Sequence, residues 1–111
     1  MPLGMGAPKT FAATRCEPRI PMEVGVQISG HPAFPDAETT FTEDVSTKGA
    51  RVRSAHRWKL NDQLTIATLP GSFHSVARVA YCLSVPGAEF ALGLEFIDST
   101  GSWVVGGGKL H

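Results

Sequence analysis

The sequence predicts an all-β protein folded as a six-stranded antiparallel barrel, and three observations support this fold class. Twelve glycines and eight prolines interrupt the 111-residue chain so often that a helical bundle is nearly excluded, because both residues destabilise helix interiors. Nine valines, nine threonines and four isoleucines favour strands. Six segments with strand-like patterns are separated by turns, and closing them into a barrel removes the exposed edges that promote aggregation.

The first two strands are expected over residues 22–29 and 38–45. In the first, every second residue from Met22 to Ile28 is apolar and the residues between are Glu, Gly and Gln, which is the alternation of a half-buried strand. The second is rich in threonine. Residues 30–36 contain two prolines, which do not fit inside a hydrogen-bonded ladder, so we expect a loop there.

The third and fourth strands are expected to be short, over residues 50–54 and 64–68. The Ser-Thr-Lys-Gly sequence at 46–49 predicts the turn before the third strand, and Asn-Asp at 61–62 predicts a turn before the fourth. The fourth strand alternates Leu and Ile with Thr and Ala, and the Pro-Gly pair at 70–71 ends it.

The last two strands are expected over residues 73–85 and 89–97, joined by a Pro-Gly turn. The second of them has the most regular alternation in the chain, and residues 98–101 are expected to turn. Strict alternation in the first of them predicts two faces, with Ala77, Val79, Tyr81 and Leu83 on one and Arg78 and Cys82 on the other.

A single domain is expected over residues 14–104, between a flexible leader at 1–13 and a flexible tail at 105–111. Residues 14–21 are polar and carry two prolines, so they are expected to form an extended linker or arm. There is no signal-peptide pattern and no apolar stretch long enough for membrane insertion. The two cysteines, Cys16 and Cys82, are too few for a disulfide scaffold, so we expect a cytoplasmic protein with free thiols.

Catalytic and metal-binding chemistry are not indicated. The four histidines and two cysteines are widely spread, and no two of them have metal-ligand spacing. Ser46 has neither a nearby histidine nor a Gly-x-Ser-x-Gly motif. The Gly-Gly-Gly-Lys sequence at 106–109 fails the phosphate-loop pattern, because residue 103 is Trp and residue 110 is Leu. Ten basic and ten acidic residues cancel, which argues against a protein that binds nucleic acid by bulk charge.

Two polar clusters remain, and each taken alone is ordinary. Arg15 and Arg19 lie four residues apart on the proline-bounded arm, where two surface arginines need no explanation. Asp44, Ser46 and Gly49 lie where the second strand runs into a turn, and turns prefer these residue types.

Together, in this order and on this fold, the two clusters resemble the PilZ domain family. The resemblance runs from Arg15 to about Trp103. It includes Arg-Cys-Glu-Pro-Arg-Ile-Pro before the first strand, Thr-Glu-Asp-Val-Ser-Thr-Lys-Gly-Ala-Arg-Val from residue 42, Ala-Arg-Val-Ala-Tyr from residue 77 and Leu-Gly-Leu-Glu-Phe from residue 92. It implies a six-stranded barrel that acts as a receptor for the bacterial second messenger cyclic di-GMP, with no catalytic activity.

The resemblance also implies which residues hold the ligand, and their chemistry suits it. An arginine fork can hold a phosphate or the O6 and N7 atoms of guanine, and an aspartate accepts hydrogen bonds from guanine N–H groups. A serine hydroxyl can contact a phosphate or a base edge, and a glycine allows close approach of the backbone. The implied ligand-binding residues are Arg15, Arg19, Asp44, Ser46 and Gly49, with Lys48 and Arg51 as candidates for secondary phosphate contacts.

The expected function is therefore a cyclic di-GMP receptor that relays the signal to a partner protein when its N-terminal arm becomes ordered over the ligand. Two alternatives stay open. One is a PilZ-like adaptor that binds a protein and no nucleotide, although both arginines are present. The other is a small barrel that binds single-stranded nucleic acid through the basic residues at 51–59, with Trp58 as a stacking platform.

Overall fold

The computed structural model describes residues 18–69 and 71–105, and these residues form seven strands. The strands are β2 (Ile20–Pro21), β3 (Gly25–Ser29), β4 (Glu38–Ser46), β5 (Gly49–Ser54), β6 (Gln63–Thr68), β7 (His74–Val85) and β8 (Glu89–Thr100). Across the two described ranges, no helix is both long and apolar enough to cross a membrane.

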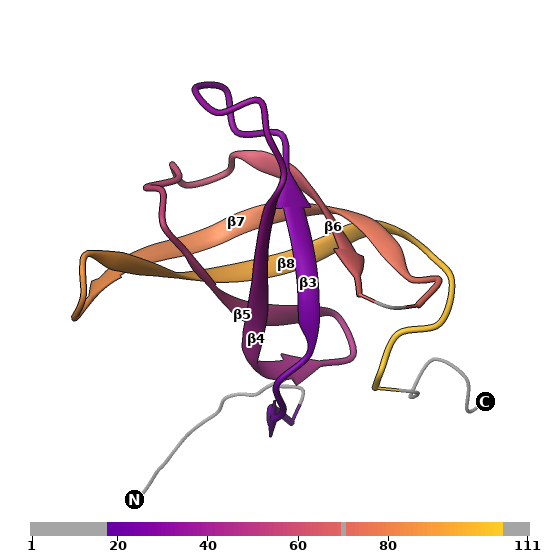
Figure 1. Ribbon diagram of the computed structural model, residues 1–111. Coiled ribbons are helices and arrows are strands. Elements are labelled where there is room, and N and C mark those ends of the chain that lie inside the picture. Colours follow the sequence, from indigo (N-terminus) through magenta and orange to yellow (C-terminus); the bar gives the residue numbers. More distant parts are fainter. Residues whose placement is uncertain (1–17, 70, 106–111) are drawn as a thin grey trace, which may run out of the picture.

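The strands form one antiparallel sheet that closes on itself. Its order is β2-β4-β3-β6-β7-β8-β5. An additional pairing between β4 and β5 closes the six strands from β3 to β8 into a ring. Figure 1 shows this ring, with the long β7–β8 hairpin extending beyond it. The predicted all-β fold class and six-stranded antiparallel barrel are confirmed, with β2 as one extra strand.

The first barrel strand begins later than the alternation predicted, at Gly25 rather than Met22. In the segment before it, the side chain of Thr42 takes part in the pairing with β4. Its hydroxyl accepts a hydrogen bond from the Val24 N–H at 2.9 Å and donates one to the Met22 carbonyl at 2.6 Å. Two backbone hydrogen bonds also hold the chain against β4 here, from the Thr42 N–H to the Val24 carbonyl at 3.0 Å and from the Met22 N–H to the Glu43 carbonyl at 3.4 Å.

The last strand ends later than predicted, because residues 98–100 are not a turn. They continue β8 and pair with the first three residues of β7, His74–Val76. The turn comes at Gly101, whose φ of 93° lies in the region that favours glycine. The extra length makes β7 and β8 the longest strands in the described part of the chain, at 12 residues each.

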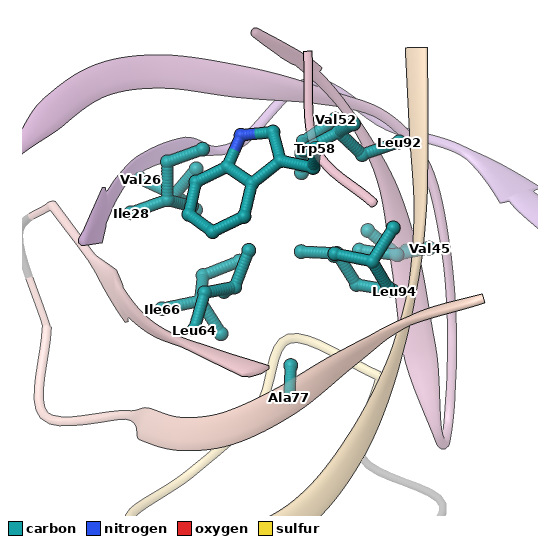
Figure 2. Packing of buried hydrophobic residues seen from close by; sticks show 12 residues of the cluster. Val26, Ile28, Val45, Val52, Trp58, Leu64, Ile66, Ala77, Leu92 and Leu94 are labelled. Atoms are coloured by element: carbon teal, nitrogen blue, oxygen red, sulfur yellow. The ribbon is translucent and has the colours of Figure 1, made fainter. Parts of the chain in front are cut away.

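The barrel interior is filled by aliphatic side chains that surround one tryptophan (Figure 2). Trp58 comes from the loop between β5 and β6, is only 3% exposed, and donates from its indole N–H to the Ser54 hydroxyl at 3.2 Å. A buried indole cannot stack on nucleic-acid bases at the surface. The alternative of a single-stranded nucleic-acid site with Trp58 as its platform is therefore wrong.

Candidate functional site

The end of β4 carries an irregularity that exposes two neighbouring carboxylates. The register against β5 shifts between Thr42 and Asp44. Because Thr42 and Val45 are both fully buried, the two residues between them, Glu43 and Asp44, lie partly exposed on the outside of the barrel. A regular strand would have placed only one of them there.

The extra strand β2 brings the end of the arm to this point. Ile20 lies opposite Val45 and Pro21 opposite Asp44, and a proline suits such an edge because it has no N–H to donate. Arg19 directly precedes β2, and its guanidinium contacts the Asp44 carboxylate from two nitrogens, at 2.8 Å from Nε and 2.7 Å from Nη2. Residues 25 positions apart, one from each predicted cluster, thus form an ion pair.

A cavity of about 450 Å³ lies beside this ion pair. It is bounded by the arm, the turn between β4 and β5, and strands β7 and β8. Three cationic side chains and one carboxylate line it, so its local charge is positive although the chain as a whole is neutral. The lining residues are Arg19, Ser46, Lys48, Gly49, Arg78, Ala80, Tyr81, Gly93, Leu94 and Glu95.

Residues from β8 and the segment after it hold the turn that carries Ser46 and Lys48. Trp103 donates its indole N–H to the Ser46 carbonyl at 2.7 Å, and the Phe96 N–H is donated to the Lys48 carbonyl at 2.8 Å. Trp103 also packs against Phe96, with ring centroids 4.9 Å apart. One wall of the cavity is therefore held by the end of β8 and the residues after it.

Packing within the barrel requires a glycine at position 49, whether or not a ligand binds. It pairs with Glu95 at the start of β5, and a Cβ added to it would lie 2.1 Å from the backbone carbonyl oxygen of Leu94. No side chain fits that space. The motif glycine therefore allows β5 to approach β8.

Because of a bulge in β7, the faces of that strand differ from the predicted ones. The register against β8 shifts between Val79 and Tyr81, so the alternation reverses at Ala80. Val79 is fully buried, while Tyr81 lines the outer cavity and Cys82 packs against the core. Strict alternation had placed Tyr81 with the buried Val79, and this prediction is wrong beyond the bulge.

The reversal puts Tyr81 on the same outer surface as Arg78. Arg78 is held by the Glu95 carboxylate, at 2.5 Å from Nη2, and by the Asn61 side-chain oxygen, at 2.7 Å from Nη1. The aromatic ring of Tyr81 covers the backbone of Gly93, its partner in β8. Both residues contribute to the cavity, and the sequence interpretation had named neither as a site residue.

Arg51 is adjacent to the cavity but is not among its lining residues. Its Nε donates to Glu43 at 2.9 Å, and Arg53 contacts the other oxygen of the same carboxylate at 2.6 Å. Partial burial acts to lower the pKa of Arg51, but its contacts with Glu43 and Tyr81 outweigh this and raise the pKa above the ordinary value. Arg51 is therefore a permanently charged neighbour of the site whose guanidinium is already bound.

The structure brings together most of the predicted ligand-binding residues. Arg19, Ser46, Lys48 and Gly49 line the cavity. Asp44 is not a lining residue but forms an ion pair with Arg19. Arg15 lies outside the described residues. The signal that could have found Arg78 is its charge at an outward position of a predicted strand, whereas the position of Tyr81 depends on a bulge that the sequence pattern does not reveal.

Comparison with known proteins identifies the family of the chain. The PilZ domain family matches residues 13–102, which is most of the chain. No curated protein matches the sequence. Within the described residues, no group of three or more His, Cys, Asp or Glu side chains could hold a metal ion. PilZ domains are non-catalytic receptor domains of a cyclic di-GMP-binding family, and this chain belongs to the PilZ domain family.

Proposed function

We propose that this PilZ domain binds cyclic di-GMP in the cavity beside Arg19 and passes the signal to a partner protein. One observation carries the proposal: Arg19, Asp44, Ser46 and Gly49, which are separated by up to 30 positions in the sequence, converge on one positively charged cavity. The cavity volume of about 450 Å³ is in the range of small-molecule sites.

The charges of the cavity suit a small dianion. Arg19 is paired with Asp44 and Arg78 with Glu95, whereas Lys48 forms no ion pair within the described residues. An arginine can hold a phosphate through two parallel hydrogen bonds, and a lysine adds a point charge. In this proposal, Arg19 and Lys48 bind the phosphates of the ligand.

Asp44 is the acceptor proposed for a guanine N–H edge. In the free protein its carboxylate is occupied by Arg19, and both side chains are partly exposed, at 49% for Arg19 and 25% for Asp44. Exposed ion pairs contribute only about 0–1 kcal/mol, so exchanging this pair for two ligand contacts costs little. The ligand phosphate then binds Arg19, and the guanine N–H edge binds Asp44.

The arm is proposed to become ordered over the ligand and to present a new surface to the partner. Arg15 is four residues from Arg19, which is at most about 13–14 Å of extended chain, so it can contact the far side of one dinucleotide. Amide hydrogen exchange of residues 14–19 should slow when cyclic di-GMP is added. Equal exchange with and without ligand would contradict the arm mechanism.

Calorimetric titration with cyclic di-GMP tests the binding itself. We expect Arg19→Ala and Asp44→Ala each to weaken binding by about ten- to a hundredfold, because each removes a charge-assisted contact of roughly 1.5–3 kcal/mol. Arg57→Ala is the matched control. Arg57 is an exposed arginine outside the cavity, over the ring of Phe90, and its loss should leave the affinity unchanged.

The outcomes separate the candidate functions. Absence of binding by the wild-type protein at tens of micromolar ligand would reject the proposal and favour a PilZ adaptor that binds only protein. Binding that is unchanged in both Arg19→Ala and Asp44→Ala would place the nucleotide elsewhere on the barrel.

A further inference from the structure

We propose that the outer half of β7, residues 80–85, is an interaction edge that pairs antiparallel with the same segment of a second copy of this chain. The inference concerns the backbone edge of a strand and not the ligand cavity, so it does not depend on the proposed function. The edge offers backbone N–H and C=O groups beside uncharged side chains, and an extended strand of like composition is the partner that such an edge fits.

Residues 80–85 have a strand partner on one side only. Up to Arg78, β7 pairs with β6 on one side and with β8 on the other. Val79 still exchanges two hydrogen bonds with the loop before β6, donating to the Asp62 carbonyl at 2.8 Å and accepting from the Asn61 N–H at 2.8 Å. Beyond this point, β8 is the only strand in the described part of the chain that pairs with β7. The N–H and C=O groups of alternate residues therefore face away from β8.

This edge lacks the features that normally protect strand edges from other chains. Natural edge strands are kept short or carry proline, lysine or other charged residues. The strand at the end of the sheet order, β2, shows two of these features, since it is two residues long and contains Pro21. The sequence of residues 80–85 is Ala-Tyr-Cys-Leu-Ser-Val, which has neither a charge nor a proline. The hairpin that carries it extends beyond the ring of strands, where a second molecule can approach (Figure 1).

Two exposed leucines lie at this edge. Leu83 belongs to the segment and is 50% exposed, and Leu60 is 64% exposed. Leu60 directly precedes Asn61, which donates to the Val79 carbonyl, so it lies where β7 loses its second strand partner. Burial of these side chains would favour association, while backbone hydrogen bonds would fix its geometry.

The charges at the two ends of the segment favour a second copy as the partner. Arg78 precedes the segment, and Glu89 follows it across the turn. When two identical edges pair antiparallel, the Arg78 end of each copy approaches the Glu89 end of the other. Within each copy Glu95 binds Arg78 and Arg53 binds Glu89, so neither end carries an unpaired charge that would repel the other copy. The pairing is self-complementary about a two-fold axis, the commonest symmetry of protein oligomers.

Sedimentation equilibrium of the whole chain under reducing conditions tests the association. Six residues of strand bury less than the roughly 1,200 Å² of a standard interface, so a weak dimer should appear between about 10 µM and 1 mM protein. Ser84→Lys should weaken it at least about tenfold, because the two copies then bring lysines together along one edge. Thr65→Lys is the matched control and should leave the association unchanged, since it adds the same charge at an exposed position of β6, where both edges are paired.

Two further measurements identify the contact as pairing between equal edges. A mixture of Ser84→Lys and Ser84→Glu should associate more tightly than either variant alone, because the mixed dimer joins opposite charges. In the wild-type protein, amide hydrogen exchange of residues 80–85 should slow as the protein concentration rises. This second measurement needs no variant, so it stands even if a substituted chain fails to fold, which thermal unfolding of each variant would reveal.

A wild-type protein that stays monomeric throughout the concentration range would overturn the proposal. An association that Ser84→Lys leaves unchanged, or that forms without slower exchange at residues 80–85, would overturn it as well. Slow exchange of these amides already in the dilute monomer would show that another segment of the same chain covers the edge, and would exclude the second copy. None of these results bears on cyclic di-GMP binding, so the proposed function is tested separately.

Discussion

At the scale of single residues, the site contains a weak ion pair, which can break and form new contacts with a ligand. It also contains one position that tolerates only glycine. The Arg19–Asp44 pair is partly exposed, so it positions both groups but contributes little to the stability of the fold. Gly49 is the opposite case. It lies in the barrel wall, and the Leu94 carbonyl oxygen occupies the place of its missing side chain.

Replacing Gly49 with alanine should therefore destabilise the fold. The added methyl group meets backbone 2.1 Å away, and relieving such overpacking typically costs about 1–3 kcal/mol. Thermal unfolding should show a clear fall in Tm. Gly25→Ala is a suitable control, because its nearest neighbour is the Leu69 carbonyl oxygen at 3.3 Å, and it should cause a smaller fall. A Gly49→Ala protein that melts like the wild type would show that β5 and β8 can separate at no cost.

At the scale of secondary-structure elements, two bulges decide which side chains reach the site. The bulge in β4 places Glu43 and Asp44 outside together, and the bulge in β7 turns Tyr81 outward. The turn between β4 and β5 is then held by a residue that follows β8, through the contact of Trp103 with the Ser46 carbonyl. The binding surface depends on contacts between elements more than on any one of them.

Trp103→Phe tests the link between that turn and the C-terminal end of the domain. Phenylalanine keeps an aromatic ring against Phe73 and Phe96 but loses the N–H that reaches Ser46. We expect a loss of about 0.5–1.5 kcal/mol in the free energy of unfolding, because one hydrogen bond is removed. Urea denaturation followed by the fluorescence of Trp58 measures it. We also expect severalfold weaker cyclic di-GMP binding, and unchanged stability and affinity would mean that the turn holds its own conformation.

At the scale of the whole molecule, a neutral closed barrel concentrates positive charge at one place. Ten basic and ten acidic residues cancel over the chain, and several of the described arginines are bound by carboxylates on the outer face of the barrel. The cavity beside Arg19 is lined by three cationic side chains and one carboxylate. Such a molecule suits a small anion better than a polyanion.

The protein should accordingly fail to bind single-stranded DNA at physiological ionic strength. Because Arg51, Arg53 and Arg78 are already bound by carboxylates, few counterions are released, and Trp58 is buried and cannot stack on bases. Fluorescence anisotropy of a labelled oligonucleotide should stay constant up to tens of micromolar protein at 0.15 M salt. Saturable binding that weakens steeply with added salt would contradict this picture of the charge distribution.

Much of this protein follows from local patterns in its sequence. The all-β class follows from alternating apolar residues and from frequent Gly and Pro, since both act through the conformation of one short segment. The residues Arg19, Asp44, Ser46 and Gly49 could likewise be named, because the two clusters in this order resemble the binding motifs of the PilZ family. What the sequence determined is thus the type of each segment and the candidate ligand-binding groups of the two clusters.

Only the tertiary structure decided which faces those segments present. A period of two predicts the face of a residue only while the pairing stays regular, and a bulge depends on hydrogen bonds made with a different strand. Tyr81 therefore lies in the cavity rather than in the core. Only one alternative interpretation had placed Trp58 at the surface. A loop side chain has no period that predicts its burial, and closure of the barrel placed this one at the centre.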